Sequence, residues 1–165
     1  MNTPQFDRIK KDLLAKHGSL EIPDFHFRWE AIETRPYRGF VDEALTHFYM
    51  KDSTDLNQDG CFVYLLLKDS NPQWMVQLSM VGRYGVVFRI EGSRILLLDE
   101  SDTNRTVEET VILQLVRKHE IALLDEATLT EPVALKMDYT DQENVCIYQA
   151  LFSDTDRLPW KSKEA

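Results

Sequence analysis

The sequence predicts one α+β domain, with an antiparallel or mixed central sheet of about six to eight strands and about three helices. Two observations favour this class: three segments carry apolar residues at helical spacing, and several shorter segments are alternately or continuously apolar, as strands are. The chain also lacks an internal repeat and a Gly/Ser linker. We assign residues 1–152 to the domain and residues 153–165, which show no periodicity, to an irregular C-terminal tail.

The N-terminal third is predicted to form two helices with a strand between them. Thr3 at the N-cap and Pro4 in the first turn begin the first helix, and Gly18 ends it. Residues 25–31 alternate apolar and polar side chains, which predicts a half-buried strand. Residues 37–50 carry apolar side chains about every fourth position, which predicts the second helix.

The middle of the chain is predicted to form strands. Residues 61–67 are apolar on both faces, which indicates a central strand covered on both sides. Residues 74–81 alternate apolar and polar side chains, which predicts a further strand. Residues 86–91 and 95–98 are predicted to pair as a hairpin, because glycine and serine follow the first segment.

The C-terminal part is predicted to contain a third helix and a second hairpin. Thr106 and Glu109 have the spacing of a capping box ahead of an apolar helical stripe. Residues 121–124 are interpreted as a short strand or as the exit from that helix. Residues 133–139 and 145–152 both alternate and are separated by a polar turn, so we expect a hairpin.

Acidic charge is concentrated in the second half of the chain. Residues 1–90 carry 12 acidic and 11 basic side chains, whereas residues 91–165 carry 16 acidic and 8 basic ones, and the net charge of the chain is −9. This balance, with a pI near 4.9, disfavours direct binding to the phosphates of nucleic acid. It predicts a partner with a positive surface.

Cysteine usage and hydropathy predict a cytosolic protein. Cys61 and Cys146 lie in apolar runs and outside any CxxC motif, so buried free thiols are favoured over a disulfide. The first 18 residues lack the apolar core of a signal peptide. No segment approaches the roughly 20 apolar residues that a membrane span requires, so no membrane association is expected.

Two groups of carboxylates are the candidate partner-binding residues. One group falls between the predicted hairpin and the third helix, and the other falls on or beside the second hairpin turn. The first contains Asp99, Glu100, Asp102, Glu108 and Glu109, and the second contains Asp138, Asp141 and Glu143. A solvated loop and a favourable charge at a helix N-terminus are the alternative explanation of the first group.

A calcium-like motif is better explained as a turn. Asp55, Asn57, Asp59 and Gly60 spell the first half of a calcium loop, but Leu66 occupies the position of the bidentate carboxylate. No flanking helices are expected, so a polar turn is favoured over a weak metal site. The four histidines show no metal-ligand or catalytic spacing. We therefore assign no catalytic residue, metal or cofactor.

These observations favour a non-enzymatic acidic protein-binding module. Its best-motivated form is an immunity or antitoxin-type inhibitor that occludes a basic toxin, for example a nuclease with a positive cleft. The alternative is a small-ligand-binding domain or an enzyme with a pocket between sheet and helices, lined by aromatic residues. Those aromatic residues would include Trp29, Tyr64, Trp74 and Phe88. A structural subunit of a larger assembly is a third reading, and the oligomeric state stays open.

Trp160 lies in an apolar tripeptide inside the polar tail. It is predicted to dock back onto the domain, because soluble proteins rarely leave a large apolar group exposed without a use. An exposed anchor for a partner is the alternative, since tryptophan is a favoured hot-spot residue.

Overall fold

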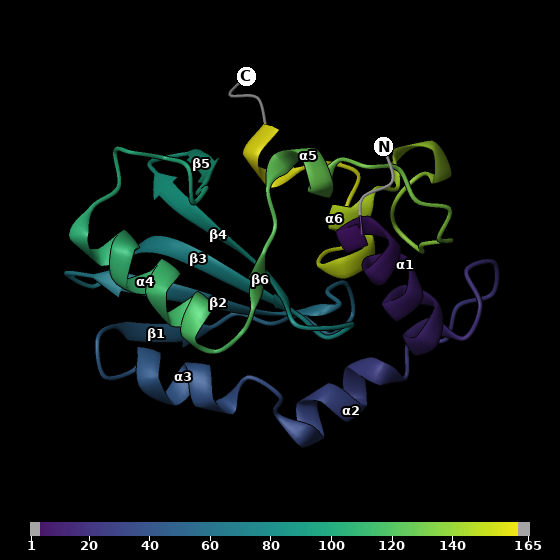
Figure 1. Ribbon diagram of the computed structural model, residues 1–165, viewed down its shortest axis with the longest axis horizontal. Coiled ribbons are helices and arrows are strands. Elements are labelled where there is room, and N and C mark those ends of the chain that lie inside the picture. The colour runs from purple at the N-terminus through teal and green to yellow at the C-terminus, as the bar shows by residue number, and fades with distance from the viewer. Residues whose placement is uncertain (1–3, 162–165) are drawn as a thin grey trace.

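The computed structural model describes residues 4–161 and has a single mixed sheet with helices around it (Figure 1). The strands are β1 (Tyr49–Asp52), β2 (Cys61–Lys68), β3 (Asn71–Ser79), β4 (Tyr84–Glu91), β5 (Arg94–Leu97) and β6 (Ala122–Leu123). The α-helices are α1 (Pro4–His17), α2 (Phe27–Thr34), α3 (Arg38–Ala44), α4 (Val107–Lys118), α5 (Glu126–Leu129) and α6 (Ile147–Leu151). Two 3₁₀ helices are η1 (Gln142–Asn144) and η2 (Pro159–Lys161). The α+β class is confirmed, whereas the number of helices exceeds the expected three.

The sheet is an antiparallel meander with one parallel addition. Strands β1 to β5 lie in sequence order, each antiparallel to the next, and β6 pairs in parallel with β4 at Tyr84 and Gly85. The turn between β4 and β5 has Gly92 at φ 62°, a left-handed conformation that glycine adopts without steric cost. The predicted hairpin of these two strands is confirmed.

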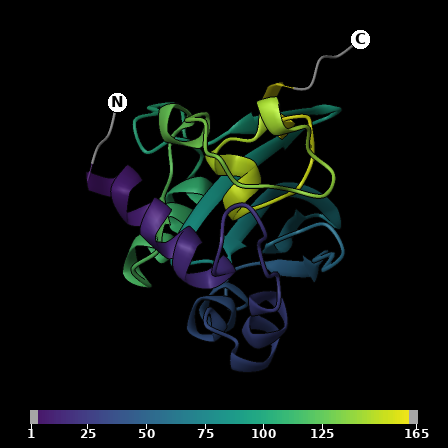
Figure 2. The same cartoon turned by 90° about the vertical axis from the view of Figure 1, so that its right-hand side faces the viewer.

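Helices α4 and α6 pack against opposite faces of the sheet (Figures 1 and 2). Trp74 on β3 donates a hydrogen bond of 2.9 Å from Nε1 to Glu109 of α4. Gln77 on the same strand accepts a hydrogen bond of 2.9 Å from the hydroxyl of Tyr148 on α6. Because side chains alternate along a strand, residues 74 and 77 point to opposite faces.

Helices α1 and α2 close the end of the sheet where β3 turns into β4. The hydroxyl of Tyr84 donates to Asp12 of α1 at 2.6 Å. The hydroxyl of Tyr37, which follows α2, lies 2.6 Å and 2.7 Å from the carbonyl oxygens of Ser79 and Gly82. Both helices are therefore tied to the sheet by buried tyrosine hydroxyls as well as by apolar packing.

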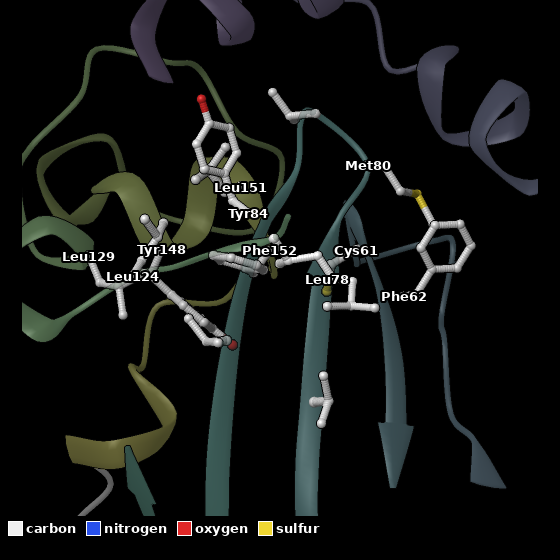
Figure 3. Packing of buried hydrophobic residues seen from close by; sticks show 14 of the residues in the cluster. Cys61, Phe62, Leu78, Met80, Tyr84, Leu124, Leu129, Tyr148, Leu151 and Phe152 are labelled. Atoms are coloured by element: carbon white, nitrogen blue, oxygen red, sulfur yellow. The ribbon is translucent and has the colours of Figure 1, made fainter. Parts of the chain in front are cut away.

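The core is continuous across both faces of the sheet. Figure 3 shows Tyr148 and Phe152 on one side of the strands and Phe62 and Met80 on the other. Tyr148 and Phe152 are fully buried, and their rings stack with centroids 5.7 Å apart. Both predicted buried thiols are confirmed, because Cys61 and Cys146 are free and buried.

Two predicted helices form where they were expected, and the predicted cap of the second one is confirmed. Helix α1 begins at Pro4 and ends at His17, although its predicted N-cap, Thr3, lies outside the described residues. Helix α4 has the predicted capping box: the N–H of Glu109 donates to Thr106 Oγ1 at 3.1 Å, and the N–H of Thr106 donates to Glu109 Oε1 at 2.9 Å.

The predicted strand at residues 25–31 is wrong, because helix α2 occupies most of that segment. Only Phe27 and Ala31 are buried in α2, and their spacing of four positions is helical. Trp29, which the alternation placed inside, is 59% exposed. The N–H of His26 donates to Asp24 Oδ1 at 2.8 Å, so a local turn begins the helix.

The predicted helix at residues 37–50 is too long. Helix α3 ends at Ala44, and residues 49–52 form the edge strand β1. Met50 pairs with Leu66 of β2 in the antiparallel register. Pairing with a strand that follows later in the sequence therefore overrides the local helical spacing.

The predicted second hairpin is also wrong. Val133, Leu135 and Met137 are buried and their neighbours are exposed, as the alternation predicts, but the segment forms no strand. Residues 145–152 are buried at every position and contain helix α6. An apolar run that is buried on all sides does not distinguish strand from helix by its periodicity.

Residues 153–161 pack onto the sheet and end in η2. The indole of Trp160 stacks on Phe88 of β4 with ring centroids 6.0 Å apart, and it meets Tyr148 edge-on at 5.3 Å. The predicted docking of Trp160 is confirmed. The short segment at 121–124 forms β6 at residues 122–123, which confirms the strand interpretation.

Candidate functional site

The two acidic groups lie at opposite ends of the molecule. The first lies in the loop between β5 and α4 and in the first turn of α4, at the left of Figure 1, and the second lies between α5 and α6, at the right. The second hairpin, which was expected to carry the second group, is absent. The two groups therefore do not form one continuous acidic surface.

Glu109, from the first group, is buried inside the protein. Its side chain is 1% exposed. Its carboxylate accepts hydrogen bonds from Arg89, Trp74 and the N–H of Thr106. Burial alone raises the pKa of this carboxyl, but the hydrogen bonds and the charge of Arg89 outweigh it and lower the pKa to about 2. Glu109 therefore fixes α4 to the sheet and is not available to a partner.

Ion pairs with the protein's own cations neutralise two more members of this group. Glu100 pairs with Arg117 at 2.5 Å, and Glu108 pairs with Lys68 at 3.0 Å. The bond from Lys68 lowers the pKa of Glu108, so this carboxylate stays ionised. A partner that used these carboxylates would have to compete with the internal cations.

Asp99 and Asp102 shape the loop ahead of α4. Asp99 Oδ1 accepts hydrogen bonds from the N–H and the hydroxyl of Ser101 at 2.8 Å and 3.0 Å. Asp102 Oδ1 accepts from the N–H of Asn104 at 2.9 Å. Both are local turns of the kind that aspartate stabilises in loops.

The second group lies on a loop whose backbone is held by a buried aspartate. Asp154 is 3% exposed. Its Oδ2 accepts hydrogen bonds from the N–H groups of Asp138 and Tyr139, both at 2.9 Å, and its Oδ1 accepts from the hydroxyl of Thr140 at 2.6 Å. One carboxylate therefore fixes three consecutive residues.

A second aspartate holds the other end of this loop. Asp156 Oδ1 accepts a hydrogen bond of 2.8 Å from the N–H of Asp141 and one of 3.2 Å from Asn144 Nδ2. Residues 138–144, which we call the acidic loop, are thus anchored at both ends to the segment that follows α6. The sequence pattern contains no sign of this anchoring, because the partners are 12 to 16 positions apart.

The acidic loop presents its own carboxylates to solvent. Asp138, Asp141 and Glu143 are exposed, and within residues 4–161 none of them forms an ion pair. Tyr139 lies between them and is 60% exposed. Tyrosine was not among the residues that the sequence singled out, because an aromatic residue in an alternating segment is first interpreted as core.

The calcium-like motif forms a turn. Asp55 Oδ1 accepts a hydrogen bond of 3.0 Å from the N–H of Asn57, and Asp59 points inward, where its Oδ1 accepts from the hydroxyl of Ser153 at 2.8 Å. Burial raises the pKa of Asp59. In the part of the chain that the structure describes, no group of three or more His, Cys, Asp and Glu side chains could hold a metal.

A cavity of about 500 Å³ lies between helices α2 and α3 and strands β1 and β2. It is lined by Ile32, Arg35, Tyr37, Arg38, Val41, Asp42, Leu45, Met50, Asp52, Phe62 and Tyr64. Of the four aromatic residues considered for a pocket from sequence, only Tyr64 lines it. Trp74 is bonded to Glu109, Phe88 packs on Trp160, and Trp29 is exposed.

Among the helices of residues 4–161, none has the length and apolar character needed to cross a membrane. Comparison with protein-family models, with curated proteins and with solved structures finds no match. The acidic loop and the cavity are therefore interpreted from their own chemistry.

Proposed function

We propose that this protein is a non-enzymatic protein-binding module whose acidic loop docks against a basic protein partner. The observation that carries this proposal is the combination found at residues 138–144. The backbone is fixed by Asp154 and Asp156, three carboxylates form no ion pair within residues 4–161, and an exposed tyrosine lies between them. The loop, rather than the group ahead of α4, is the primary contact, because the protein's own cations already neutralise part of that group.

Rigidity of the loop favours binding. Ordering a flexible loop at an interface costs conformational free energy, and a loop that is already fixed avoids much of this cost. Tyrosine is one of the residues that most often dominate binding free energy, since it buries a large area with few rotatable bonds. The surrounding carboxylates accelerate encounter with a positive surface. Tyr139 is thus the anchor, and the carboxylates select the partner.

The specific form that we propose is an immunity or antitoxin-type inhibitor of a basic toxin, such as a nuclease. A nuclease cleft is positive because it binds phosphates, and carboxylates set on a rigid loop can occupy the same cationic positions. We place this inhibition in the cytosol, where free thiols such as Cys61 and Cys146 stay reduced. The mechanism is occlusion of the cleft without chemistry on the partner.

Affinity capture tests this proposal. The tagged protein is incubated with lysate of its own source at low and at high salt, and the retained proteins are identified by mass spectrometry. The expected result is one basic protein in near-stoichiometric amount at low salt, with weaker retention at high salt.

Charge reversal then locates the contact. The triple variant Asp138→Lys, Asp141→Lys and Glu143→Lys should lose the partner. A control with the same change of charge reverses three exposed carboxylates elsewhere, Glu21, Glu30 and Glu33, and should keep it. Equal loss from both variants would show that only net charge matters, and retention by both would reject the acidic loop as the contact.

A further inference from the structure

We propose that the cavity between α2, α3, β1 and β2 binds a small zwitterion with an apolar side chain, of the class of the free apolar α-amino acids. The cavity is lined by an apolar wall, by the hydroxyl of Tyr64, and by a cation and a carboxylate, Arg35 and Asp52, that form no ion pair within residues 4–161. The proposal is independent of the acidic loop, which lies outside the residues that line the cavity.

The wall of the cavity is apolar and well supported. Phe62 and Tyr64 are neighbours on the same face of β2, and their rings stack with centroids 6.4 Å apart and an interplanar angle of 10°. Tyr37 packs edge-on against Phe62 at 5.9 Å. The aliphatic part of the wall comes from Ile32, Val41, Leu45 and Met50. A volume of about 500 Å³ lies within the range of small-molecule sites in proteins.

Four charged residues line the cavity, and two of them already pair with each other. Arg38 and Asp42 lie one helical turn apart on α3, with Nε and Oδ2 separated by 3.9 Å. Arg35 and Asp52 form no ion pair in residues 4–161, although both lie at the same cavity. Asp52 Oδ1 accepts a hydrogen bond of 3.0 Å from the N–H of Thr54, so the guanidinium of Arg35 and the remaining acceptor positions of Asp52 are left for a ligand.

Tyr64 lines the cavity together with Arg35 and Asp52. Asp52 of β1 pairs directly with Tyr64 of β2 in the strand register, so both side chains point to the same face. Arg35 lines the same cavity, so the guanidinium, the carboxylate and the phenol all border one space. Within the described chain the hydroxyl of Tyr64 forms no hydrogen bond, and burial raises the pKa of this tyrosine to about 12, so the hydroxyl keeps its proton as a donor.

Arg35 lies at the C-terminal end of α2, where the helix stops beside the cavity. Arg35 ends helix α2 in the left-handed conformation, with φ 51° and ψ 62°. Glycine or asparagine adopts this conformation at lower cost, and helices commonly end with one of them. The guanidinium of Arg35 forms no ion pair within residues 4–161, so it is available to a ligand in the cavity that it lines.

A zwitterion satisfies all three polar groups at once. Its carboxylate pairs with Arg35 and accepts from the hydroxyl of Tyr64, and its ammonium group pairs with Asp52. Its apolar side chain then lies against the rings of Phe62 and the aliphatic wall. A ligand with a single charge would make only one of these two charge-assisted contacts, so it would gain less binding free energy.

Isothermal titration of the full-length protein with L-phenylalanine, L-leucine and L-methionine tests the proposal. We expect saturable binding of at least one of them at concentrations up to about 10 mM. Two analogues of phenylalanine serve as ligand controls: 3-phenylpropanoate lacks the ammonium group, and phenethylamine lacks the carboxylate. Each should bind at least about tenfold more weakly, as loss of one charge-assisted contact predicts.

Variants locate the site without unfolding the protein. Arg35→Asn and Asp52→Asn should each weaken binding about tenfold, and Tyr64→Phe should weaken it several-fold. Asparagine tolerates the left-handed backbone at residue 35. Removing the hydroxyl of Tyr64 breaks no hydrogen bond within residues 4–161. Arg94→Gln, on the exposed start of β5, is the control and should leave affinity unchanged.

Three results would overturn the proposal. The first is no saturable binding of the three amino acids, and the second is equal affinity for the analogues that carry one charge. The third is unchanged affinity in Arg35→Asn and Asp52→Asn, since binding would then occur elsewhere. Denaturant unfolding of each variant shows whether a loss of affinity reflects loss of the ligand contact or loss of the fold.

Discussion

The guanidinium of Arg89 on β4 holds the carboxylate of Glu109 on α4 through two hydrogen bonds, from Nε to Oε2 at 2.7 Å and from Nη2 to Oε1 at 2.6 Å. The same carboxylate accepts from the indole of Trp74 and from the N–H of Thr106. A single buried side chain thus completes the capping box and fixes the helix to the sheet.

Replacing Glu109 should destabilise the fold strongly. Glu109→Gln removes the charge that compensates Arg89, and it replaces an acceptor oxygen with an amide donor beside other donors. We expect a loss of about 2–4 kcal/mol in the free energy of unfolding, measured by urea denaturation. The adjacent Glu108→Gln is the control: it breaks only the partly exposed pair with Lys68 and should cost under about 1 kcal/mol. Similar losses in both variants would contradict this assignment.

Glu109 should also make stability depend on acid pH. Its pKa in the folded protein is about 2, below its ordinary value of 4.5. A depressed carboxyl pKa contributes stability that is present above the unfolded pKa and is lost as pH falls through the folded pKa. The difference in unfolding free energy between the native protein and Glu109→Gln should therefore be full above pH 4.5 and shrink between pH 4.5 and about 2. A difference that stays constant over this window would show that Glu109 is not the group responsible.

His17 should give a second pH dependence nearer neutrality. It is 2% exposed, its Nδ1 donates to the carbonyl of Leu13 at 2.8 Å, and Phe25 and Phe27 pack edge-on against the ring. Burial lowers its pKa below the ordinary 6.5, so the folded protein resists protonation. Stability should be full above pH 6.5 and should decline as pH falls from there through the folded pKa.

Two histidine variants, one at a buried and one at an exposed position, test whether His17 causes this pH dependence. His17→Leu should remove the decline in unfolding free energy just below pH 6.5, because no buried imidazole is then left to charge. His47→Leu changes an exposed histidine and should leave the decline unchanged. The prediction fails if both variants follow the pH profile of the native protein.

Asp154 should control the rigidity of the acidic loop. Asp154→Ala removes three hydrogen bonds, two of them to backbone N–H groups, and should cost about 2–4 kcal/mol of stability. Hydrogen exchange at the amides of Asp138 and Tyr139 should accelerate, because both amides lose their acceptor. Asp156→Ala is the control and should leave these two amides protected, since Asp156 holds the other end of the loop. Unchanged exchange in Asp154→Ala would contradict the anchoring.

Trp160 should contribute to stability through its contact with the sheet. Trp160→Ala removes ring contacts with Phe88 and Tyr148 and should lower the free energy of unfolding by about 1–3 kcal/mol. Trp29→Ala changes an indole that is 59% exposed and should alter stability by less than about 0.5 kcal/mol. Thermal unfolding of both variants tests whether residues 153–161 stabilise the fold by docking on the sheet. Equal losses of stability in Trp160→Ala and Trp29→Ala would argue against this docking.

Features that depend on neighbours in the sequence were predicted correctly. The capping box at Thr106 and Glu109, the proline at the start of α1 and the turn at Gly92 each act within a few residues. Strands β2 to β5 form a meander, so each strand pairs with the next along the chain. Such elements are readable from the sequence because their partners are close in the chain.

The erroneous elements lie where distant residues decide the conformation. Residues 25–31 and 145–152 are short apolar segments that fit either structure by periodicity, and packing against other elements selects the helix. Residues 133–139 keep the predicted alternation of burial, but this part of the chain meets residues 145–152 only in one isolated antiparallel bridge, between Pro132 and Cys146, and forms no ladder beyond it. A strand exists only when a second strand supplies its hydrogen bonds.

By itself the sequence determined the α+β class, the buried thiols and the residues that carry the acidic charge. Only the tertiary structure decided how those charges are used. It buried Glu109 against Arg89, turned Asp154 into the support of the acidic loop, and set Arg35 and Asp52 at one cavity. The physical reason is that the state and role of a charge depend on its burial and on the donors around it, which residues far apart in the chain supply.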